Sequence, residues 1–443
     1  MWDGLFVRIL KRCLVTGRLD VTFADGRRQQ FGPPDGLPSV ALHIHDTGLT
    51  RRLVLNPELA LGEAYTDGGL TIANDDLIGF LTLIMRFDPG PRWSPLSLLM
   101  RFNKALMWLS DLNPAPRARV NVAHHYDLSP EIYDAFLDRN KQYTCAYFRD
   151  PGMTLEQAQL AKMQHIGRKL LLRPGQSVLD IGCGFGTLAI YLAREFGVRV
   201  TGVTLSQVQL AEATSRAKAA GVADYVTFRL KDYRAVTGPF DRVVSVGMME
   251  HVGLPHLGTY FRKVRDLLTP DGVALIHYIG RPLPPMRISP WFQKYIFPGA
   301  YCPSLSQVLP VIENERIALC DIEVWRGHYN PTLAAWRANF EANAPRIEAQ
   351  TDARFIRMWR YYLAASEVSF AEGLLTIHQL QLARRQNAVP ASRDYLYAPS
   401  SAARQGRNTR AGNLAQTERA HQVSEGVDLF GRAGHLEHKA FKG

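Results

Sequence analysis

The chain has 443 residues, of which 46% are hydrophobic and 21% charged, and its formal net charge is +11. This composition is typical of a globular protein that buries a core, and the length predicts two folded units and a tail. Five scattered cysteines exclude a disulfide framework or a zinc-ligand spacing and favour a reducing compartment. No signal peptide or membrane-spanning run is expected, and the positive charge indicates nucleic acid, an anionic membrane surface, or solubility alone.

The first part of the chain predicts a small α+β unit. Residues 18–23 and 40–44 alternate between apolar and polar side chains, as half-buried strands do. A helical stretch with regularly spaced leucines follows through residues 53–61. The triplet Asn-Asp-Asp at 74–76 is typical of a helix N-cap and predicts a second helix over residues 77–86.

A tryptophan-containing apolar segment comes next. Residues 92–112 combine a broad apolar arc with the basic residues Arg92, Arg101 and Lys104. Such a helix is suited to a membrane interface, and a helix buried between two domains would have the same pattern. The Asn-Pro-Ala-Pro sequence at 113–116 breaks the helix and predicts a linker.

Strands and helices alternate after about residue 119. Short apolar runs predict strands near residues 178–181, 199–203, 226–230, 242–246 and 273–277, with helical segments between them. This order is typical of a doubly wound, mainly parallel α/β sheet. In such sheets, ligands bind outside the carboxyl ends of the strands.

The most informative stretch is a glycine-rich turn within residues 177–187, between a strand and a helix. Asp180 lies at the end of the strand, and Gly182, Gly184 and Gly186 let the backbone turn tightly and approach a ligand. The free N–H groups at the start of the helix point toward that ligand. A turn that only packs the helix on the strand is the plain structural alternative.

Three features of this turn favour S-adenosylmethionine (SAM) over a dinucleotide. The third glycine comes one residue earlier than in the dinucleotide motif, and a carboxylate precedes the turn. The second strand also ends in residues 204–207, which lack the acidic residue that would hold a ribose.

Several further motifs lie at the other strand ends and before the glycine turn. They occupy residues 124–129, 142–148, 154–159, 248–253, 275–280, 291–299 and 328–333. In this order they resemble the cyclopropane-fatty-acyl-phospholipid synthase family, which includes the mycolic acid cyclopropane synthases. The resemblance covers residues 40–395 and is strongest from 120 to 335.

The resemblance implies a SAM-dependent methyltransferase with a seven-stranded, Rossmann-like sheet. We expect a lipid- or membrane-associated α+β domain at 1–118, a catalytic domain at 119–390, and a low-complexity, disordered tail at 391–443. The positions that match the family's SAM contacts are Tyr143, Thr144, Asp180, Gly182, Gly184, Gly186, Thr204, Gln209, Asp232 and Tyr233.

The implied reaction is transfer of a methylene group from SAM to the cis double bond of an unsaturated phospholipid acyl chain. Methyl transfer to an alkene leaves a carbocation, so a base must remove a proton while water is excluded. In the family this base is a bound bicarbonate. Its matching ligands are Cys145, Glu250, His277, Tyr329 and the backbone of Ile279.

Some of these residues also have an ordinary structural interpretation. Cys145 could be a small buried hydrophobic residue, His277 a hydrogen-bonded core histidine, and Asp232 a surface turn residue. Glu250 is harder to explain, because a carboxylate after an apolar strand must be paired or functional.

One departure from the family pattern is Ser366, where many family members have a cysteine. Either that position is not catalytic, which we favour, or this protein does different chemistry.

The resemblance also implies partners and a location. We expect a cytoplasmic enzyme, peripherally associated with the inner face of the membrane, which acts on acyl chains at an anionic surface and forms a homodimer through its first domain. Residues 291, 292 and 295–297 are expected to form the walls and mouth of an acyl tunnel, with Arg287 and Lys294 available for lipid phosphate. No nucleic acid partner is expected, because the aromatic residues occur in apolar runs.

Other functions stay open at this point. The main alternative is a SAM-dependent fatty-acyl C-methyltransferase that gives a branched or methylene product. A small-molecule N-methyltransferase is disfavoured by the complete bicarbonate set, because an amine substrate needs no such base. An RNA methyltransferase and a noncatalytic lipid-binding protein are the remaining candidates, and the latter would have little reason to keep the SAM loop.

Overall fold

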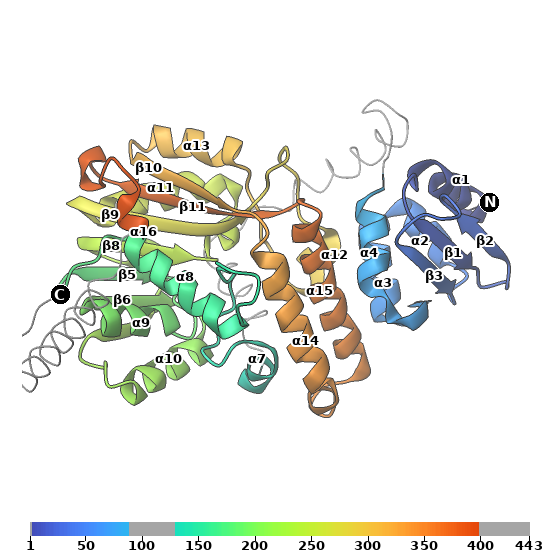
Figure 1. Ribbon diagram of the computed structural model, residues 1–443, viewed down its shortest axis with the longest axis horizontal. Coiled ribbons are helices and arrows are strands. Elements are labelled where there is room, and N and C mark those ends of the chain that lie inside the picture. Colours follow the sequence, from blue (N-terminus) through green and yellow to red (C-terminus); the bar gives the residue numbers. More distant parts are fainter. Residues whose placement is uncertain (1, 88–128, 398–443) are drawn as a thin grey trace, which may run out of the picture. The chain divides into compact units, whose positions relative to one another are not determined.

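The computed structural model describes residues 2–87 and 129–397, which form the elements drawn in Figure 1. The chain divides into a compact unit, Met1–Val389, and a remainder, Pro390–Gly443, of which the short helix α16 (Asp394–Tyr397) is described. The predicted helix at 92–112, the linker at 113–116 and the tail beyond 397 lie outside the described residues. The domain limits at 118 and 390 therefore stay predictions.

A four-stranded sheet forms near the N-terminus, in the order β2-β1-β3-β4. Its strands are β1 (Arg18–Thr22), β2 (Arg28–Phe31), β3 (Ser39–Ile44) and β4 (Leu70–Ile72). β1 and β3 run parallel, whereas the other two pairs are antiparallel. The strands predicted at 18–23 and 40–44 are confirmed, because their alternating apolar residues face one core.

The helices of this part are α1 (Trp2–Cys13), α2 (Leu49–Leu55), α3 (Pro57–Thr66) and α4 (Leu77–Met85). The helical stretch predicted over 53–61 is confirmed except at Asn56, where the chain breaks and divides it into α2 and α3. Pro57 disfavours helical geometry in the preceding residue, so it begins a new helix instead. The predicted cap of α4 is confirmed: the Asp76 carboxylate accepts a hydrogen bond from the Gly79 amide at 2.9 Å.

The second sheet has seven strands, in the order β10-β11-β9-β8-β5-β6-β7. Its strands are β5 (Ser177–Ile181), β6 (Arg199–Thr204), β7 (Val226–Leu230), β8 (Phe240–Val246), β9 (Leu268–Gly280), β10 (Ala318–Trp325) and β11 (Thr376–Ala383). The five predicted strands are β5 to β9, all parallel, so the predicted mainly parallel sheet is confirmed. β10 and β11 add an antiparallel edge.

Helices cover both faces of this sheet (Figure 1). One apolar core joins the sheet to α8 (Leu155–Lys169), α9 (Thr187–Phe196) and α10 (Gln207–Ala219). A second core joins it to α11 (Leu257–Leu267) and α13 (Leu305–Asn314). This is the two-layered covering that a doubly wound sheet requires.

A third group of helices adjoins the carboxyl ends of the strands. It comprises α7 (Pro130–Phe136), α12 (Pro290–Tyr295) and the long pair α14 (Tyr329–Glu348) and α15 (Ala353–Ala371). Short 3₁₀ helices are η1 (Ala73–Asp75), η3 (Tyr233–Ala235), η4 (Met249–His251), η5 (Leu254–His256) and η6 (Gln386–Ala388). α15 packs on both α3 and α4, and α12 packs on α3, so the N-terminal helices share a core with this group.

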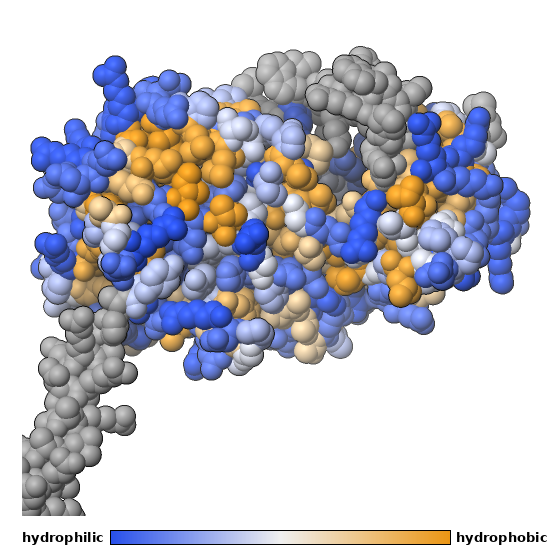
Figure 2. Space-filling view, turned by 45° about the horizontal axis from the view of Figure 1, so that its top comes forward, coloured by the Kyte–Doolittle hydropathy of each residue, from blue (hydrophilic) through white to orange (hydrophobic). Residues whose placement is uncertain are grey.

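The surface in Figure 2 is mostly hydrophilic, with hydrophobic side chains gathered where Figure 1 places α13 and β10. α13 carries the partly buried Leu309 and β10 the partly buried Ile322, and Val324 of β10 is 41% exposed. Among the described residues, no helix combines the length and apolar character that crossing a bilayer requires.

Gly186 provides a test of how tightly the glycine turn is packed. Its φ is +77°, and an added Cβ would lie 2.5 Å from the Phe228 ring and 2.9 Å from Ala213. Gly221 has a similar φ of +68° but opens onto free space. We expect Gly221→Ala to cost roughly 1–2 kcal/mol for its backbone conformation alone, and Gly186→Ala to cost about 1–3 kcal/mol more through overpacking. Urea unfolding without ligand measures the free energy of unfolding of both variants. An equal loss of this free energy in the two variants would contradict the packing argument.

Candidate active site

The turn after β5 forms the floor of a pocket. Gly182, Gly184 and Gly186 all have positive φ, and the Gly182 amide donates to the Val203 carbonyl at 2.9 Å, which ties the turn to β6. α9 begins directly after Gly186, so its first amides face the pocket. The sequence predicted this strand, turn and helix correctly.

Nine of the ten predicted SAM contacts line this one pocket, which we call the cofactor pocket. They are Tyr143, Thr144, Asp180, Gly182, Gly184, Thr204, Gln209, Asp232 and Tyr233. Gly186 does not line it; it packs behind the turn against Phe228. The residues come from the ends of three strands, β5, β6 and β7, and from the segment before α8, which the fold brings together. Their roles as SAM contacts stay predictions.

Asp180 is the buried acceptor of the cofactor pocket. Its Oδ2 has no hydrogen-bond partner among the described residues, and burial raises the pKa of the side chain to about 7. An acceptor in this state suits a ligand that carries ammonium or hydroxyl donors, as SAM does. The residues present therefore fit SAM.

The predicted adenine end has two features. Asp232 accepts hydrogen bonds from the backbone and side chain of Arg234, which hold its carboxylate at the pocket edge. Tyr233 is buried and packs edge-on against Tyr260 at 5.5 Å between ring centroids. On the neighbouring strand, the Thr204 hydroxyl donates to Gln209 at 2.8 Å.

A second pocket adjoins the first and contains the whole predicted bicarbonate set. Cys145, Glu250, His277, Ile279 and Tyr329 line it together with apolar side chains, which include Ile288, Phe292, Phe297, Leu333, Phe370 and Leu375. We call it the acyl pocket for this apolar lining. The two pockets share Tyr143, Thr144, Gly247 and His251, so a wall of single residues separates them.

Glu250 is positioned by the strand beside it. Its Oε1 accepts the Ile279 amide at 2.5 Å, whereas its Oε2 is buried without a partner among the described residues. Burial raises the pKa of Glu250 to about 7. The Ile279 amide, predicted to contact the anion, is therefore used here to hold Glu250.

Two other members of the set, His277 and Cys145, are also shifted toward uncharged forms. Burial lowers the pKa of His277 well below its usual value, and Lys162 and Lys169 lower it further. Burial likewise raises the pKa of the Cys145 thiol far above its usual range, and its Sγ contacts the Ala146 carbonyl at 3.2 Å. Cys145 is thus a thiol, which can donate only a weak hydrogen bond.

Ser366, from α15, lines the acyl pocket as well. The predicted tunnel residues divide: Phe292 and Phe297 line the pocket, whereas Trp291 is fully buried against Gly62 and Tyr361. Lys294, expected to be available for lipid phosphate, pairs with Glu63 at 2.8 Å.

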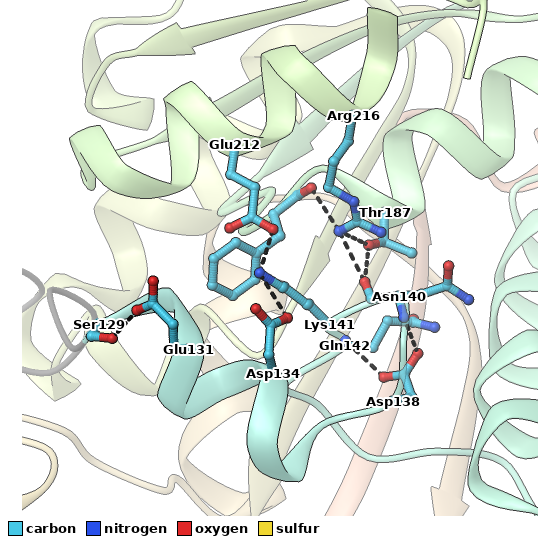
Figure 3. A network of polar contacts seen from close by, with 11 residues as sticks. Ser129, Glu131, Asp134, Asp138, Asn140, Lys141, Gln142, Thr187, Glu212 and Arg216 are labelled. Carbon is cyan, nitrogen blue, oxygen red and sulfur yellow. Dashed lines mark hydrogen bonds and ion pairs between the residues drawn. The ribbon is translucent and has the colours of Figure 1, made fainter. Parts of the chain in front are cut away.

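A polar network fixes the segment that leads into Tyr143, Thr144 and Cys145 (Figure 3). Lys141 pairs with Asp134 at 2.9 Å and with Glu212 at 2.6 Å. The Arg216 guanidinium donates to the Asn140 carbonyl at 3.0 Å and to the Thr187 hydroxyl at 2.9 Å. These contacts tie α7, α9 and α10 to one loop, which positions the residues of the shared wall.

Sequence reasoning missed Lys162, which also lines the cofactor pocket. Its Nζ donates to the Thr144 hydroxyl at 2.6 Å, and burial lowers the pKa of Lys162 to about 8. Because an ammonium group only donates, the Thr144 hydroxyl must direct its own proton elsewhere. The available signal was a lysine on the apolar face of α8, between Ala158 and Ile166.

The mostly parallel seven-stranded sheet, with a ligand pocket at the glycine turn after β5, defines a SAM-dependent methyltransferase. The chain belongs to the family described as mycolic acid cyclopropane synthetase, whose model matches residues 114–380. A second model, described as a domain of unknown function (DUF7884), matches residues 5–81. The protein is therefore a SAM-dependent enzyme that modifies fatty acids.

Individual relatives agree with this assignment. A cyclopropane-fatty-acyl-phospholipid synthase from Escherichia coli is 35% identical over 79% of this chain and 89% of its own length. A probable fatty acid methyltransferase from Pseudomonas putida is 34% identical over 80% of this chain and 89% of its own. This chain also matches a crystal structure of a mycolic acid cyclopropane synthase complexed with SAH and CTAB. The sequence identity is 30% and the TM-score 0.58, and the match covers 61% of this chain and 99% of the chain in the crystal structure.

Replacing Lys162 tests its part in the cofactor pocket. We expect Lys162→Met to weaken binding of S-adenosylhomocysteine about tenfold, because a charge-assisted hydrogen bond contributes roughly 1.5–3 kcal/mol. Lys218→Met, on the exposed side of α10, serves as the control and should bind normally. Calorimetric titration measures both. Equal affinities in a folded Lys162→Met protein would remove Lys162 from the binding machinery.

Proposed function

We propose that this protein is a cyclopropane synthase that adds a methylene bridge across the cis double bond of unsaturated phospholipid acyl chains. The observation that carries the proposal is a cluster of buried polar groups inside an apolar pocket that shares a wall with the cofactor pocket. When bound, SAM supplies the methyl group on its sulfonium.

The acyl pocket meets two requirements of such a reaction. Its apolar side chains exclude water from a substrate cation. Its buried polar groups provide proton acceptors and donors where otherwise only carbon would be present. Tyr143, Thr144 and His251 line both pockets, so they would flank the path of the methyl group and align the alkene with the cofactor.

We also propose bicarbonate as the base held in this pocket. The residues fit such an anion: the Tyr329 hydroxyl and a ring N–H of His277 are donors, and Glu250 Oε2 is an acceptor without a partner among the described residues. Bound bicarbonate would supply a general base away from solvent. Glu250, as a carboxylate, is the group of this chain that can accept a proton there.

A fatty-acyl C-methyltransferase is the second candidate. A relative named as a probable fatty acid methyltransferase is 34% identical to this chain and one named as a tuberculostearic acid methyltransferase 33%, against 35% for the synthase. Ser366 lines the acyl pocket, where many family members have a cysteine. The two activities differ in which proton the substrate cation loses, so the product decides between them.

Membrane docking and a homodimer are further parts of the proposal. Removing an acyl chain from a bilayer costs about 0.8 kcal/mol per CH₂, so an apolar pocket must receive the chain directly at the surface. The net charge of +11 favours an anionic surface.

The first experiment uses methyl-labelled SAM and vesicles of cis-unsaturated phosphatidylglycerol or phosphatidylcholine. We expect labelled acyl chains that gain one CH₂ and resist hydrogenation, with faster turnover on the anionic vesicles at low salt. A gain of CH₂ that takes up hydrogen would favour a methylene product. That product is the one expected of the C-methyltransferase, because a saturated branched chain would need a hydride donor that neither SAM nor the vesicles supply. No label in the lipid, with SAM still bound, would discard both.

Glu250 provides a pH-dependent test. Because the pKa of Glu250 is about 7, its side chain is a neutral acid below that pH and a carboxylate above it. The profile of kcat against pH should therefore have a rising limb near pH 7. We expect Glu250→Gln to lower kcat about 100-fold, the lower end for general acid–base catalysis, and to remove the limb. SAM must be saturating, because Asp180 titrates in the same range within the cofactor pocket. An unchanged limb in the variant would assign it to another group.

A further inference from the structure

Gln379 lies directly behind the His277 ring. The two residues face each other across the antiparallel pair β9 and β11, and both are almost completely buried, at 0% and 1% exposure. The Gln379 side-chain nitrogen lies 3.0 Å from His277 Nδ1. His277 lines the acyl pocket and Gln379 does not, so the amide contacts the substrate side only through the ring.

The surroundings keep the ring neutral. Burial is the largest cause of its lowered pKa; Lys162, Lys169 and His165 act in the same direction, whereas Glu323 opposes them. Trp325 packs edge-on against the ring at 5.1 Å. A neutral imidazole carries one proton, and the partner of one nitrogen decides which nitrogen carries it.

We propose that Gln379 is a positioning residue that donates to Nδ1 and thereby keeps the proton of His277 on Nε2. This inference rests on the proposed function, in which His277 presents an N–H donor to an anionic base in the acyl pocket. Gln379 acts through His277 and touches no reactant itself.

The chemistry of the pocket favours this arrangement of the amide. The reversed amide would accept from Nδ1–H and leave Nε2 as an acceptor toward the pocket. The pocket already holds an acceptor without a partner among the described residues, Glu250 Oε2, so a second acceptor would repel an anion. With the amide as placed, the pocket gains a donor instead.

An amide also serves better than a carboxylate at this position. A carboxylate beside Nδ1 would favour the imidazolium form by attraction and by accepting its proton. A charged ring would then pair with the anionic base and reduce its readiness to take a proton. A neutral amide fixes the ring without adding charge.

The experiment compares Gln379→Glu and Gln379→Met with the matched control Gln381→Met. Gln381 lies two residues away on the same strand, is also 0% exposed, and its side-chain nitrogen donates to the Lys169 carbonyl at 2.6 Å. Its loss therefore disturbs the same part of the core without touching His277.

The first measurement is nitrogen NMR of ring-labelled histidine in the full chain, with His277→Asn to assign the signal. We expect the wild type and Gln381→Met to carry the proton on Nε2. Gln379→Glu should move it to Nδ1 or give the imidazolium, and Gln379→Met should give a mixture of tautomers. A wild-type ring with its proton on Nδ1 would overturn the proposal, even if neither variant folds.

The second measurement is kcat with saturating SAM and lipid, together with S-adenosylhomocysteine affinity. We expect kcat to fall about 100-fold in Gln379→Glu and about tenfold in Gln379→Met, within the range for misdirected acid–base groups, and less than threefold in Gln381→Met. Affinity for S-adenosylhomocysteine should not change, because Gln379 does not line the cofactor pocket. Losses no larger than those of the control would overturn the proposal.

These outcomes are separable from failure of the proposed function. The tautomer is measured without lipid, SAM or bicarbonate, so it tests Gln379 even if the wild type makes no lipid product. Conversely, wild-type turnover that is unaffected by removal of bicarbonate would reject the proposed base, while the tautomer result still holds or fails by itself.

Discussion

Burial of three ionisable side chains at neighbouring strand ends is the constraint on which the site depends. Asp180 ends β5, Glu250 follows β8, and His277 lies near the end of β9. Burial raises the pKa of both carboxyls to about 7 and lowers that of the imidazole. All three are shifted toward uncharged forms, and both carboxyls keep an oxygen without a partner among the described residues. Such groups cost stability, and a bound ligand with complementary donors offsets that cost.

The N-terminal part of the chain contributes to the same site from outside. Glu63 of α3 accepts from Lys294 and Tyr295 of α12, and Gly62 lets the Trp291 ring approach α3 closely. Exposed ion pairs contribute only about 0–1 kcal/mol, so the buried tryptophan carries most of this contact. α12 and the turn after it supply Phe292 and Phe297 to the acyl pocket, and α15 supplies Tyr362 and Phe370. The shape of that pocket therefore depends on helices that rest on the N-terminal part.

Local sequence patterns were sufficient for the parallel strands and for the glycine turn, because buried runs such as 178–181 and the spacing of glycines carry their own signal. They were insufficient for β10 and β11, since β11 contains His378, Gln379 and Gln381, which do not suggest a buried strand. The break at Asn56 was missed because the leucines continue their spacing through it. The bicarbonate set came from family resemblance. Lys162 had a local signal, its place on the apolar face of α8, but its contact with Thr144 joins two elements, and Gln379 became visible only through its contact with His277 across the sheet.

The wall between the two pockets shows how the fold meets the geometric demand of the proposed transfer. A methyl group moves between reactants only when donor and acceptor carbon lie about 3–3.5 Å apart, so no side chain of the wall can stand between those two carbons. Gly247 stands in this wall with φ +67°, and an added Cβ would lie 2.8 Å from the Thr144 methyl. A side chain there would clash with Thr144 and occupy the space between the pockets. The same close approach lets Lys162 act on Thr144 from one side while Glu250 and His277 face the acyl pocket on the other.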